Sequence, residues 1–176
     1  GTLIGTLAGH DGWVVSLAFS PDGKRLASAS NDRRIILWDM AQRRIEKVLE
    51  GHGDVVDAVA FSPDGKRLAS GGDDNAVIVW DVQKGEPLMT LQGHTSFLKA
   101  VSYAPDGRTI ASAGLDQKII LWDAATGRRI RTLAGQDSMI FCIGWTRDGS
   151  RLASGGNSIL IWDAAGGEIL RSIRSF

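Results

Sequence analysis

The residues with the clearest potential for chemistry are the three histidines of the chain. Each is followed at a constant spacing by a serine and then an aspartate, which gives the sets His10–Ser28–Asp32, His52–Ser70–Asp74 and His94–Ser112–Asp116. A nucleophile, a general base and a group that orients the base are what a serine hydrolase requires. A hydrolase needs one such triad, however, and here every histidine belongs to a copy of one pattern. The repetition favours a structural role, and we expect a non-enzymatic protein.

Other kinds of chemistry find little support in the sequence. One cysteine, Cys142, and three well-separated histidines lack the spacing of a zinc site. The adjacent Asp73 and Asp74 suggest a cation site, but two neighbouring acids are more often part of a turn. The glycines do not form a phosphate-binding loop. We therefore expect no metal and no cofactor.

The charge balance bears on the class of partner. Lysine plus arginine and aspartate plus glutamate both number 20, so the formal net charge is zero. Nucleic-acid binders and electrostatic membrane anchors usually carry a basic excess, so we expect neither partner. A single cysteine permits no internal disulfide, and the first residues do not resemble a signal peptide. These features predict a cytoplasmic protein.

The histidines belong to an internal repeat with a period of 42 residues, which indicates internal duplication. The dipeptide Gly-His recurs at positions 9, 51 and 93, and Trp-Asp recurs at 38, 80, 122 and 162. The phrase SPDGKRLAS occurs at 20–28 and again at 62–70. A single array is therefore predicted over 1–176, with repeats at 9–50, 51–92, 93–134 and 135–176.

Each repeat reads as four short strands without a helical period. An apolar segment such as Trp13–Ser20 leads into the turn Ser-Pro-Asp-Gly, in which proline and glycine favour a reversal of the chain. The returning strand begins at Arg25, and the apolar segment Ile35–Asp39 follows a polar turn. This segment is apolar on both faces, so we expect it between two sheets. The last strand, Arg44–Glu50, mixes charged and apolar residues like an exposed edge.

The spacing of Gly-His and Trp-Asp, repeated along almost the whole chain, resembles the WD-repeat β-propeller family. The resemblance implies an all-β fold in which each repeat supplies a blade of four antiparallel strands, with four blades per chain. It also implies a hydrogen-bonded tetrad inside each blade, namely His10, Ser28, Asp32 and Trp38; His52, Ser70, Asp74 and Trp80; and His94, Ser112, Asp116 and Trp122.

The fourth repeat departs from this pattern. Gln136 stands in place of the histidine, the turn before Ile159 is two residues shorter, and no aspartate aligns, although Ser154 and Trp162 remain. We expect this blade to be the least stable. Cys142 aligns with Ser16, Ala58 and Ala100, so we expect it to be buried inside a strand. Trp145 aligns with Phe19, Phe61 and Tyr103 as a core aromatic.

The tryptophan that remains unassigned is Trp13. The resemblance places three positions of each repeat on one face near the central channel. In repeat 1 they are Trp13, the residue two positions later (Val15) and the residue before the tetrad aspartate (Asn31). These positions vary while the rest repeats, and they gather large apolar side chains, which favours a protein-binding site. The predicted interaction face consists of Trp13, Val15, Asn31, Val55, Asp57, Asp73, Phe97, Lys99, Leu115, Met139 and Phe141.

Four blades are about half of the ring that most propellers close. In addition, residues 1–8 align with the outer strand at 85–92, so an extra outer strand is predicted before the first repeat. We expect a protein-interaction scaffold that forms a homodimer, in which two copies close an eight-bladed ring. The alternatives are an excised or engineered fragment whose only property is assembly, a longer array, a strained ring of four blades, and a propeller that binds a ligand such as a glycan.

Overall fold

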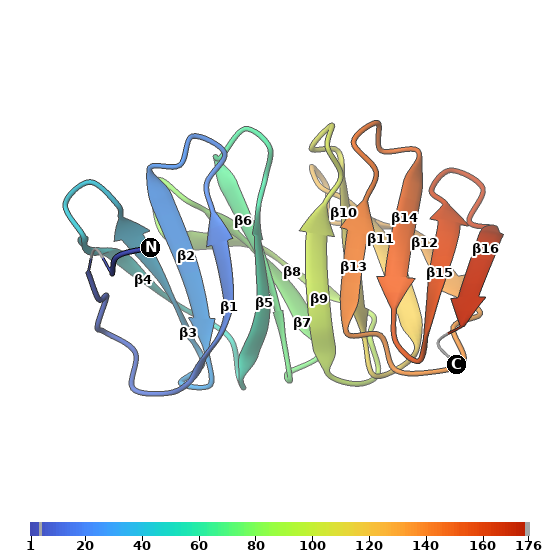
Figure 1. Cartoon of the computed structure of the whole chain (residues 1–176), viewed down its shortest axis with the longest axis horizontal. Coiled ribbons are helices and arrows are strands. Elements are labelled where there is room, and N and C mark those ends of the chain that lie inside the picture. The colour runs from blue at the N-terminus through green and yellow to red at the C-terminus, as the bar shows by residue number, and fades with distance from the viewer. Residues whose placement is uncertain (4, 175–176) are drawn as a thin grey trace.

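The computed structural model of the chain describes residues 1–3 and 5–174. Within this part the fold is all-β and contains no helix, and sixteen strands form four antiparallel sheets of four strands each. Every sheet is built from consecutive strands of one repeat, and the sheets stand side by side like the blades of a propeller (Figure 1). The prediction of four blades of four antiparallel strands is confirmed.

The strands have the same order in every blade, from the inner strand on the concave side of the arc to the outer strand. Blade 1 contains β1 (Val14–Phe19), β2 (Arg25–Ser30), β3 (Arg34–Asp39) and β4 (Arg44–Glu50). Blade 2 contains β5 (Val56–Phe61), β6 (Arg67–Gly72), β7 (Ala76–Asp81) and β8 (Glu86–Gln92). Blade 3 contains β9 (Leu98–Tyr103), β10 (Thr109–Gly114), β11 (Lys118–Asp123) and β12 (Arg129–Ala134). Blade 4 contains β13 (Cys142–Trp145), β14 (Arg151–Gly155), β15 (Ser158–Asp163) and β16 (Ile169–Arg174).

The Ser-Pro-Asp-Gly turn joins the first two strands of a blade as predicted. In blade 1 the amide of Gly23 donates to the carbonyl of Ser20 at 2.8 Å, and Gly23 has a φ of 69°. The Ser20 hydroxyl donates to the carboxylate of Asp22 at 2.6 Å, which fixes the polar side of the turn. Glycine tolerates this left-handed backbone without a steric cost, so the turn closes a tight hairpin.

The core lies between the blades. One cluster joins blades 1 and 2, a second joins blades 2 and 3, and a third joins blades 3 and 4. The apolar strand β3 has Ile35, Ile36 and Leu37 completely buried, as its pattern predicts. Because each blade buries its faces only against its neighbours, the stability of the array comes chiefly from these three interfaces.

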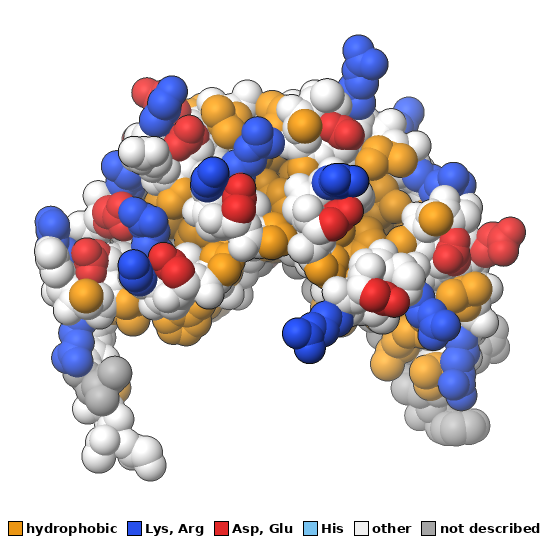
Figure 2. All heavy atoms as spheres, turned by 90° about the horizontal axis from the view of Figure 1, so that it is seen from above, with side chains coloured by type: hydrophobic (Ala, Val, Ile, Leu, Met, Phe, Trp, Pro, Cys, Tyr) orange, Lys and Arg blue, Asp and Glu red, His pale blue; other side chains and the backbone are white. Residues whose placement is uncertain are grey.

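The four blades form an open arc rather than a closed ring. Seen from the side of the Ser-Pro-Asp-Gly turns, the arc carries charged side chains of both signs along its length and apolar side chains at both ends (Figure 2). The inner strands of neighbouring blades lie beside one another in the order β1, β5, β9, β13. Blades 1 and 4 do not meet in the part of the chain that the structure describes.

Two predictions about the ends of the array were wrong. The extra outer strand predicted at 1–8 is absent, since residues 1–3 and 5–8 form no strand. A β-strand needs a neighbouring strand for its hydrogen bonds, and no strand of the four described sheets pairs with this segment. Cys142 is exposed rather than buried. Its equivalents Ala58 and Ala100 are buried in their blades, and Ala58 lies in the core cluster shared with the following blade, whereas blade 4 is the last blade in the described residues.

Candidate interaction face

The tetrads of the first three blades have the predicted geometry. In blade 1, Ser28 accepts a hydrogen bond from the indole N–H of Trp38 at 2.8 Å and bonds to Nε2 of His10 at 2.7 Å. The other ring nitrogen of His10, Nδ1, lies 2.8 Å from a carboxylate oxygen of Asp32. A neutral imidazole with its hydrogen on Nδ1 satisfies both contacts. The same chain of bonds recurs with nearly equal lengths in blades 2 and 3.

The electrostatics of the tetrads favour a locked network. Burial raises the pKa of Asp32, but hydrogen bonds from His10 and from the backbone amides of Arg34 and Asp11 outweigh it and hold the pKa well below its usual value. In blade 3 burial lowers the pKa of His94 against the opposing effect of its aspartate. The serine hydroxyls are almost completely buried, so a substrate cannot reach them. The arrangement orients a tryptophan inside a blade and suits a structural role.

Blade 4 builds a different network at the same place. Ser154 again accepts from the indole N–H of Trp162 at 2.8 Å, and its own hydroxyl donates to Oε1 of Gln136 at 2.8 Å. The amide nitrogen of Gln136 donates to the backbone carbonyl of Ser158 at 3.0 Å. One glutamine side chain thus accepts at one atom and donates at the other, so the missing aspartate leaves no polar atom of this network without a partner.

The residues of the predicted interaction face lie together at the ends of the blades opposite the Ser-Pro-Asp-Gly turns. In blade 1 the amide of Asn31 donates to the carbonyl of Trp13 at 3.0 Å, which brings two of the three positions together. The same bond links Asp73 to Val55 and Leu115 to Phe97, each at 2.9 Å. In each of the first three blades, one backbone hydrogen bond therefore holds the residue before the tetrad aspartate next to the residue three positions after the histidine.

Large apolar side chains are exposed along this face. Trp13 is 80% exposed, and Val15, Phe97, Met139 and Phe141 are also exposed. In contrast, Val55 and Leu115 are half-buried. Several large apolar side chains exposed on one face are more informative than any single exposed residue, because such groups mark interaction sites.

An ion cluster, which the sequence did not reveal, joins blades 2 and 3 on the same face. The ammonium of Lys99 lies 2.8 Å from a carboxylate oxygen of Asp57 and 2.8 Å from one of Asp73. Burial raises the pKa of Asp57 despite the hydrogen bond from Lys99. Burial lowers the pKa of Lys99, but its two aspartate partners outweigh this and raise it. The ammonium also lies 5.6 Å from the centre of the Phe97 ring, so it stands beside the apolar part of the face.

The signal that could have found this cluster is the change of charge between equivalent positions of neighbouring repeats. Asp57 and Lys99 occupy the same position in repeats 2 and 3. Equivalent residues of adjacent inner strands lie side by side in this fold, so opposite charges there predict an ion pair.

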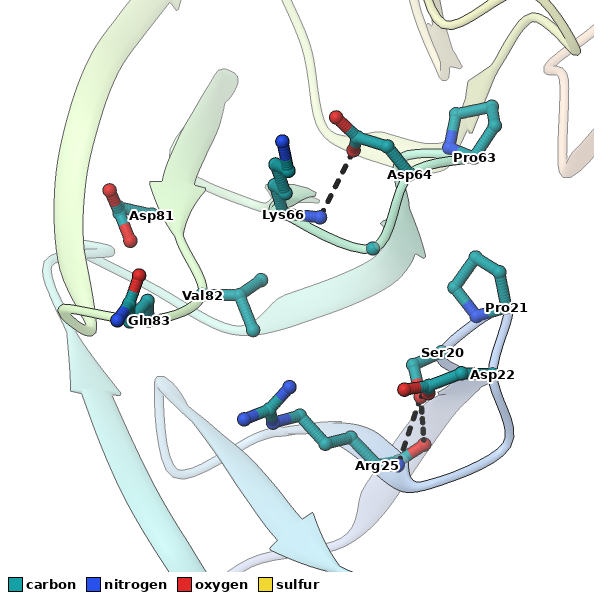
Figure 3. Close-up of a pocket in the computed structure, with 11 residues that line it drawn as sticks. Ser20, Pro21, Asp22, Arg25, Pro63, Asp64, Lys66, Asp81, Val82 and Gln83 are labelled. Atoms are coloured by element: carbon teal, nitrogen blue, oxygen red, sulfur yellow. Dashed lines mark hydrogen bonds between the residues drawn. The ribbon is translucent and has the colours of Figure 1, made fainter.

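The opposite face holds a series of shallow hollows between the turns. Figure 3 shows the one between blades 1 and 2, which is lined by Asp22 and Arg25 of blade 1 and by Asp64 and Lys66 of blade 2. The carboxylates of Asp22 and Asp64 accept hydrogen bonds from backbone amides of their own turns, and Arg25 pairs with Glu46, so these charges are satisfied locally. Among the described residues no group of three or more histidine, cysteine or acidic side chains could hold a metal ion. No helix in the described residues could cross a membrane.

Comparison with known proteins gives the same picture of the fold. A β-propeller family model described as WDR41 matches residues 42–172, and the model of the WD domain, G-beta repeat, matches residues 1–39. The nuclear distribution proteins PAC1 of Tuber melanosporum (strain Mel28) and of Arthroderma benhamiae are each 55% identical over 42 residues, and that of Coccidioides posadasii is 52% identical over 42 residues. Each match covers 24% of this chain and 9% of the relative.

Proteins with WD repeats generally act as non-catalytic scaffolds that bind protein partners. The repeats, the tetrads, the four-stranded blades and the two family matches agree with one another. The chain belongs to the WD-repeat β-propeller family.

Proposed function

We propose that this chain is a non-enzymatic protein-interaction scaffold whose ring is completed by a second copy of the same chain. The observation that carries the proposal is the apolar surface at the two ends of the arc. Because the blades are repeats, each end can be compared with the same position in an inner blade. A side chain that is exposed at an end of the arc but buried at the equivalent position of an inner blade is one that a neighbouring blade would cover.

At the first end, β1 exposes the side chains that other inner strands bury against the preceding blade. Phe19 is 62% exposed, whereas its equivalent Tyr103 in blade 3 is 8% exposed. Val14 and Leu17 are exposed as well, while Val56, the equivalent of Val14, is completely buried. This end therefore presents the surface with which blade 2 packs against blade 1.

At the last end, β15 and β16 expose the side chains that other blades bury against the following blade. Ile159 is 47% exposed, whereas its equivalent Ile35 in blade 1 is completely buried. Ile173 is exposed while its equivalent Leu49 is buried. This end presents the surface with which blade 1 packs against blade 2, so the two ends of the arc are complementary.

A second copy fits both ends at once. Blade 4 of each copy would pack against blade 1 of the other, and the two joints are related by a two-fold axis. The resulting eight blades stand at the upper end of the usual range of about 4–8 blades. Closure would also bring Trp13, beside one joint, into a continuous rim with the apolar residues of both copies. This rim is the proposed surface for a protein partner.

The first test is the native mass in solution, measured by light scattering after size exclusion. We expect the wild-type chain to have twice the mass of its 18.8 kDa monomer. Ile159→Lys should reduce the mass to that of one chain, because it places a charge in the joint. Leu88→Lys, at an exposed apolar position on the outer strand β8, is the matched control and should leave the dimer intact. A wild-type monomer at every accessible concentration would contradict ring closure by a second copy.

The second test concerns the binding face. The double variant Trp13→Ala with Phe97→Ala should fold with the wild-type unfolding midpoint, because both side chains are exposed. It should also lose a partner that the wild-type chain captures, provided that the partner is then shown to bind the purified wild-type chain directly. A collapse of stability in this variant would mean that the two aromatic residues serve packing rather than binding.

A further inference from the structure

We propose that residues 5–9, which we call the N-terminal cap, occupy the place on blade 1 where β16 of a second copy must dock. The cap and the second copy would then compete for one site, and the cap would weaken the dimer. The inference rests on the proposed ring closure, and it adds a regulatory contact within the chain itself. Three contacts of the cap carry it.

The first contact is that of Leu7 with the end of blade 1. Leu7 packs on a cluster of buried side chains that consists of Leu26, Ile36 and Trp38. In the inner part of the array, Leu49 of β4 belongs to a cluster that contains the equivalent residues Leu68, Ile78 and Trp80 of blade 2. Leu7 and Leu49 are equivalent in the repeat. Leu7 therefore lies on blade 1 as the outer strand of a preceding blade would lie.

The second contact lies two residues further along the cap. A Cβ placed on Gly9 would lie 3.0 Å from the ring of Trp38, and one placed on Gly51 would lie 2.9 Å from the ring of Trp80. Gly51 follows β4 directly, and its equivalent Gly9 is the last residue of the cap. The chain thus approaches the blade tryptophan equally closely in both places.

The third contact lies at the start of the cap. A Cβ placed on Gly5 would lie 3.5 Å from the side chain of Arg43. The equivalent pair in the next repeat is Lys47 and Gly85, where a Cβ placed on Gly85 would lie 2.9 Å from the Lys47 side chain. All three contacts of the cap therefore repeat those of an outer strand, although the cap itself forms no strand.

The competition follows from the repeat. Ile173 of β16 pairs with Ile159 as Leu49 of β4 pairs with Ile35, so Ile173 is also an equivalent of Leu7. In a ring closed by a second copy, Ile173 of that copy would lie on the cluster of blade 1 that Leu7 now covers. Two side chains would claim one site, and one of the two segments must leave.

The cap is the segment that leaves more readily. β16 is held to β15 by an antiparallel ladder that runs from Ser158–Arg174 to Trp162–Ile169. The cap has no ladder, and Leu7 is only partly buried. Displacing the cap therefore costs fewer contacts than displacing β16, and removing the side chain of Leu7 should favour the dimer.

The test compares dimer dissociation constants, measured by sedimentation equilibrium, for Leu7→Ser, Ile173→Ser and Leu3→Ser. Leu7→Ser should tighten the dimer by about tenfold for each joint, or about a hundredfold for both, given the burial that a leucine side chain loses. Ile173→Ser should weaken the dimer by at least as much. Leu3 is exposed in the same terminal segment, so Leu3→Ser is the matched control and should change nothing. A chain that lacks residues 1–8 should behave like Leu7→Ser.

The outcomes separate this inference from the proposal on which it rests. If dimers form but Leu7→Ser weakens them, the cap is part of the joint rather than its competitor, and the inference is wrong. If dimers form and neither Leu7→Ser nor the truncation changes the constant, there is no competition. If no variant forms a dimer at any concentration, ring closure by a second copy fails and the competition fails with it.

Discussion

The role of the tetrads can be tested by removing one hydroxyl from the middle of a network. Ser70 in blade 2 is completely buried and stands between two polar groups. It accepts a hydrogen bond from Trp80 at 2.8 Å and lies 2.7 Å from Nε2 of His52. In Ser70→Ala the indole N–H of Trp80 and Nε2 of His52 lose this partner at once.

The magnitude follows from the number of orphaned groups. A buried polar group left without a partner costs about 1–3 kcal/mol, so two such groups cost about 2–5 kcal/mol after partial relaxation. That is a large fraction of the stability of a typical domain, which is about 5–15 kcal/mol. The volume change from serine to alanine is small, so a cavity contributes little. The loss should therefore come almost entirely from the indole and the imidazole.

The assay is urea unfolding followed by tryptophan fluorescence, with the slope of the transition compared between variants. Ser102→Ala serves as the matched control, because Ser102 lies in an inner strand and makes only a 3.5 Å hydrogen bond to the carbonyl of Tyr103. The control should remain within about 0.5 kcal/mol of the wild-type chain. A Ser70→Ala variant that unfolds at the wild-type midpoint with an unchanged slope would refute the view that the tetrads stabilise the blades.

Three further predictions follow from the charges and the repeats. The unfolding free energy should fall as the pH drops through about 6.5, by at most about 1.4 kcal/mol per pH unit. The reason is that burial lowers the pKa of His94 in the folded chain, so the unfolded chain takes up the proton first. Urea unfolding between pH 7 and pH 5 measures this. At a concentration at which the chain is monomeric, hydrogen exchange should be faster in β14 and β15 than in β6 and β7, since blade 4 of a single chain packs only against blade 3; equal protection would contradict this. Lys99→Met should destabilise the chain by about 1–2 kcal/mol at pH 7, because it leaves the carboxylates of Asp57 and Asp73 without their shared cation. The loss should be smaller at pH 3, where protonation of the carboxylates relieves their repulsion. Thermal unfolding at both pH values measures the difference.

The repeat carries most of the fold in the sequence. A repeat of about 42 residues, with glycine at the same place in all four turns and proline in the first three, predicts one sheet per repeat, and the sheets coincide with the repeats. The tetrads of blades 1–3 could be predicted residue by residue because the resemblance to the WD-repeat family implies them and the repeat places their members at matching positions. The network of blade 4 could not be predicted, because the backbone carbonyl of Ser158 takes the place of the aspartate. Every residue has a backbone carbonyl, so the sequence does not show which one accepts the bond.

The predictions that were wrong share one physical cause. Cys142 was expected to be buried because it aligns with the small residues Ser16, Ala58 and Ala100, and residues 1–8 were expected to form a strand because they align with the predicted outer strand at 85–92. Both expectations assume that equivalent positions of the repeat have the same burial and the same neighbours. In a propeller the neighbouring blade supplies half of that environment, so positions at the ends of the array differ from their equivalents in the middle.

The end blades have nevertheless kept the apolar side chains of inner blades. Terminal repeats of a stable array usually carry a polar outer face, because an uncovered apolar face promotes aggregation. Here Phe19 at one end and Ile159 at the other are as apolar as their buried equivalents, and no charge interrupts either face at those positions. Among the described residues the cap covers part of one face, through Leu7, and it does so with the contacts of an outer strand. An end that keeps the surface of an interior blade is suited to meeting another blade, and this supports ring completion by a complementary arc over a role as a free monomeric half-ring.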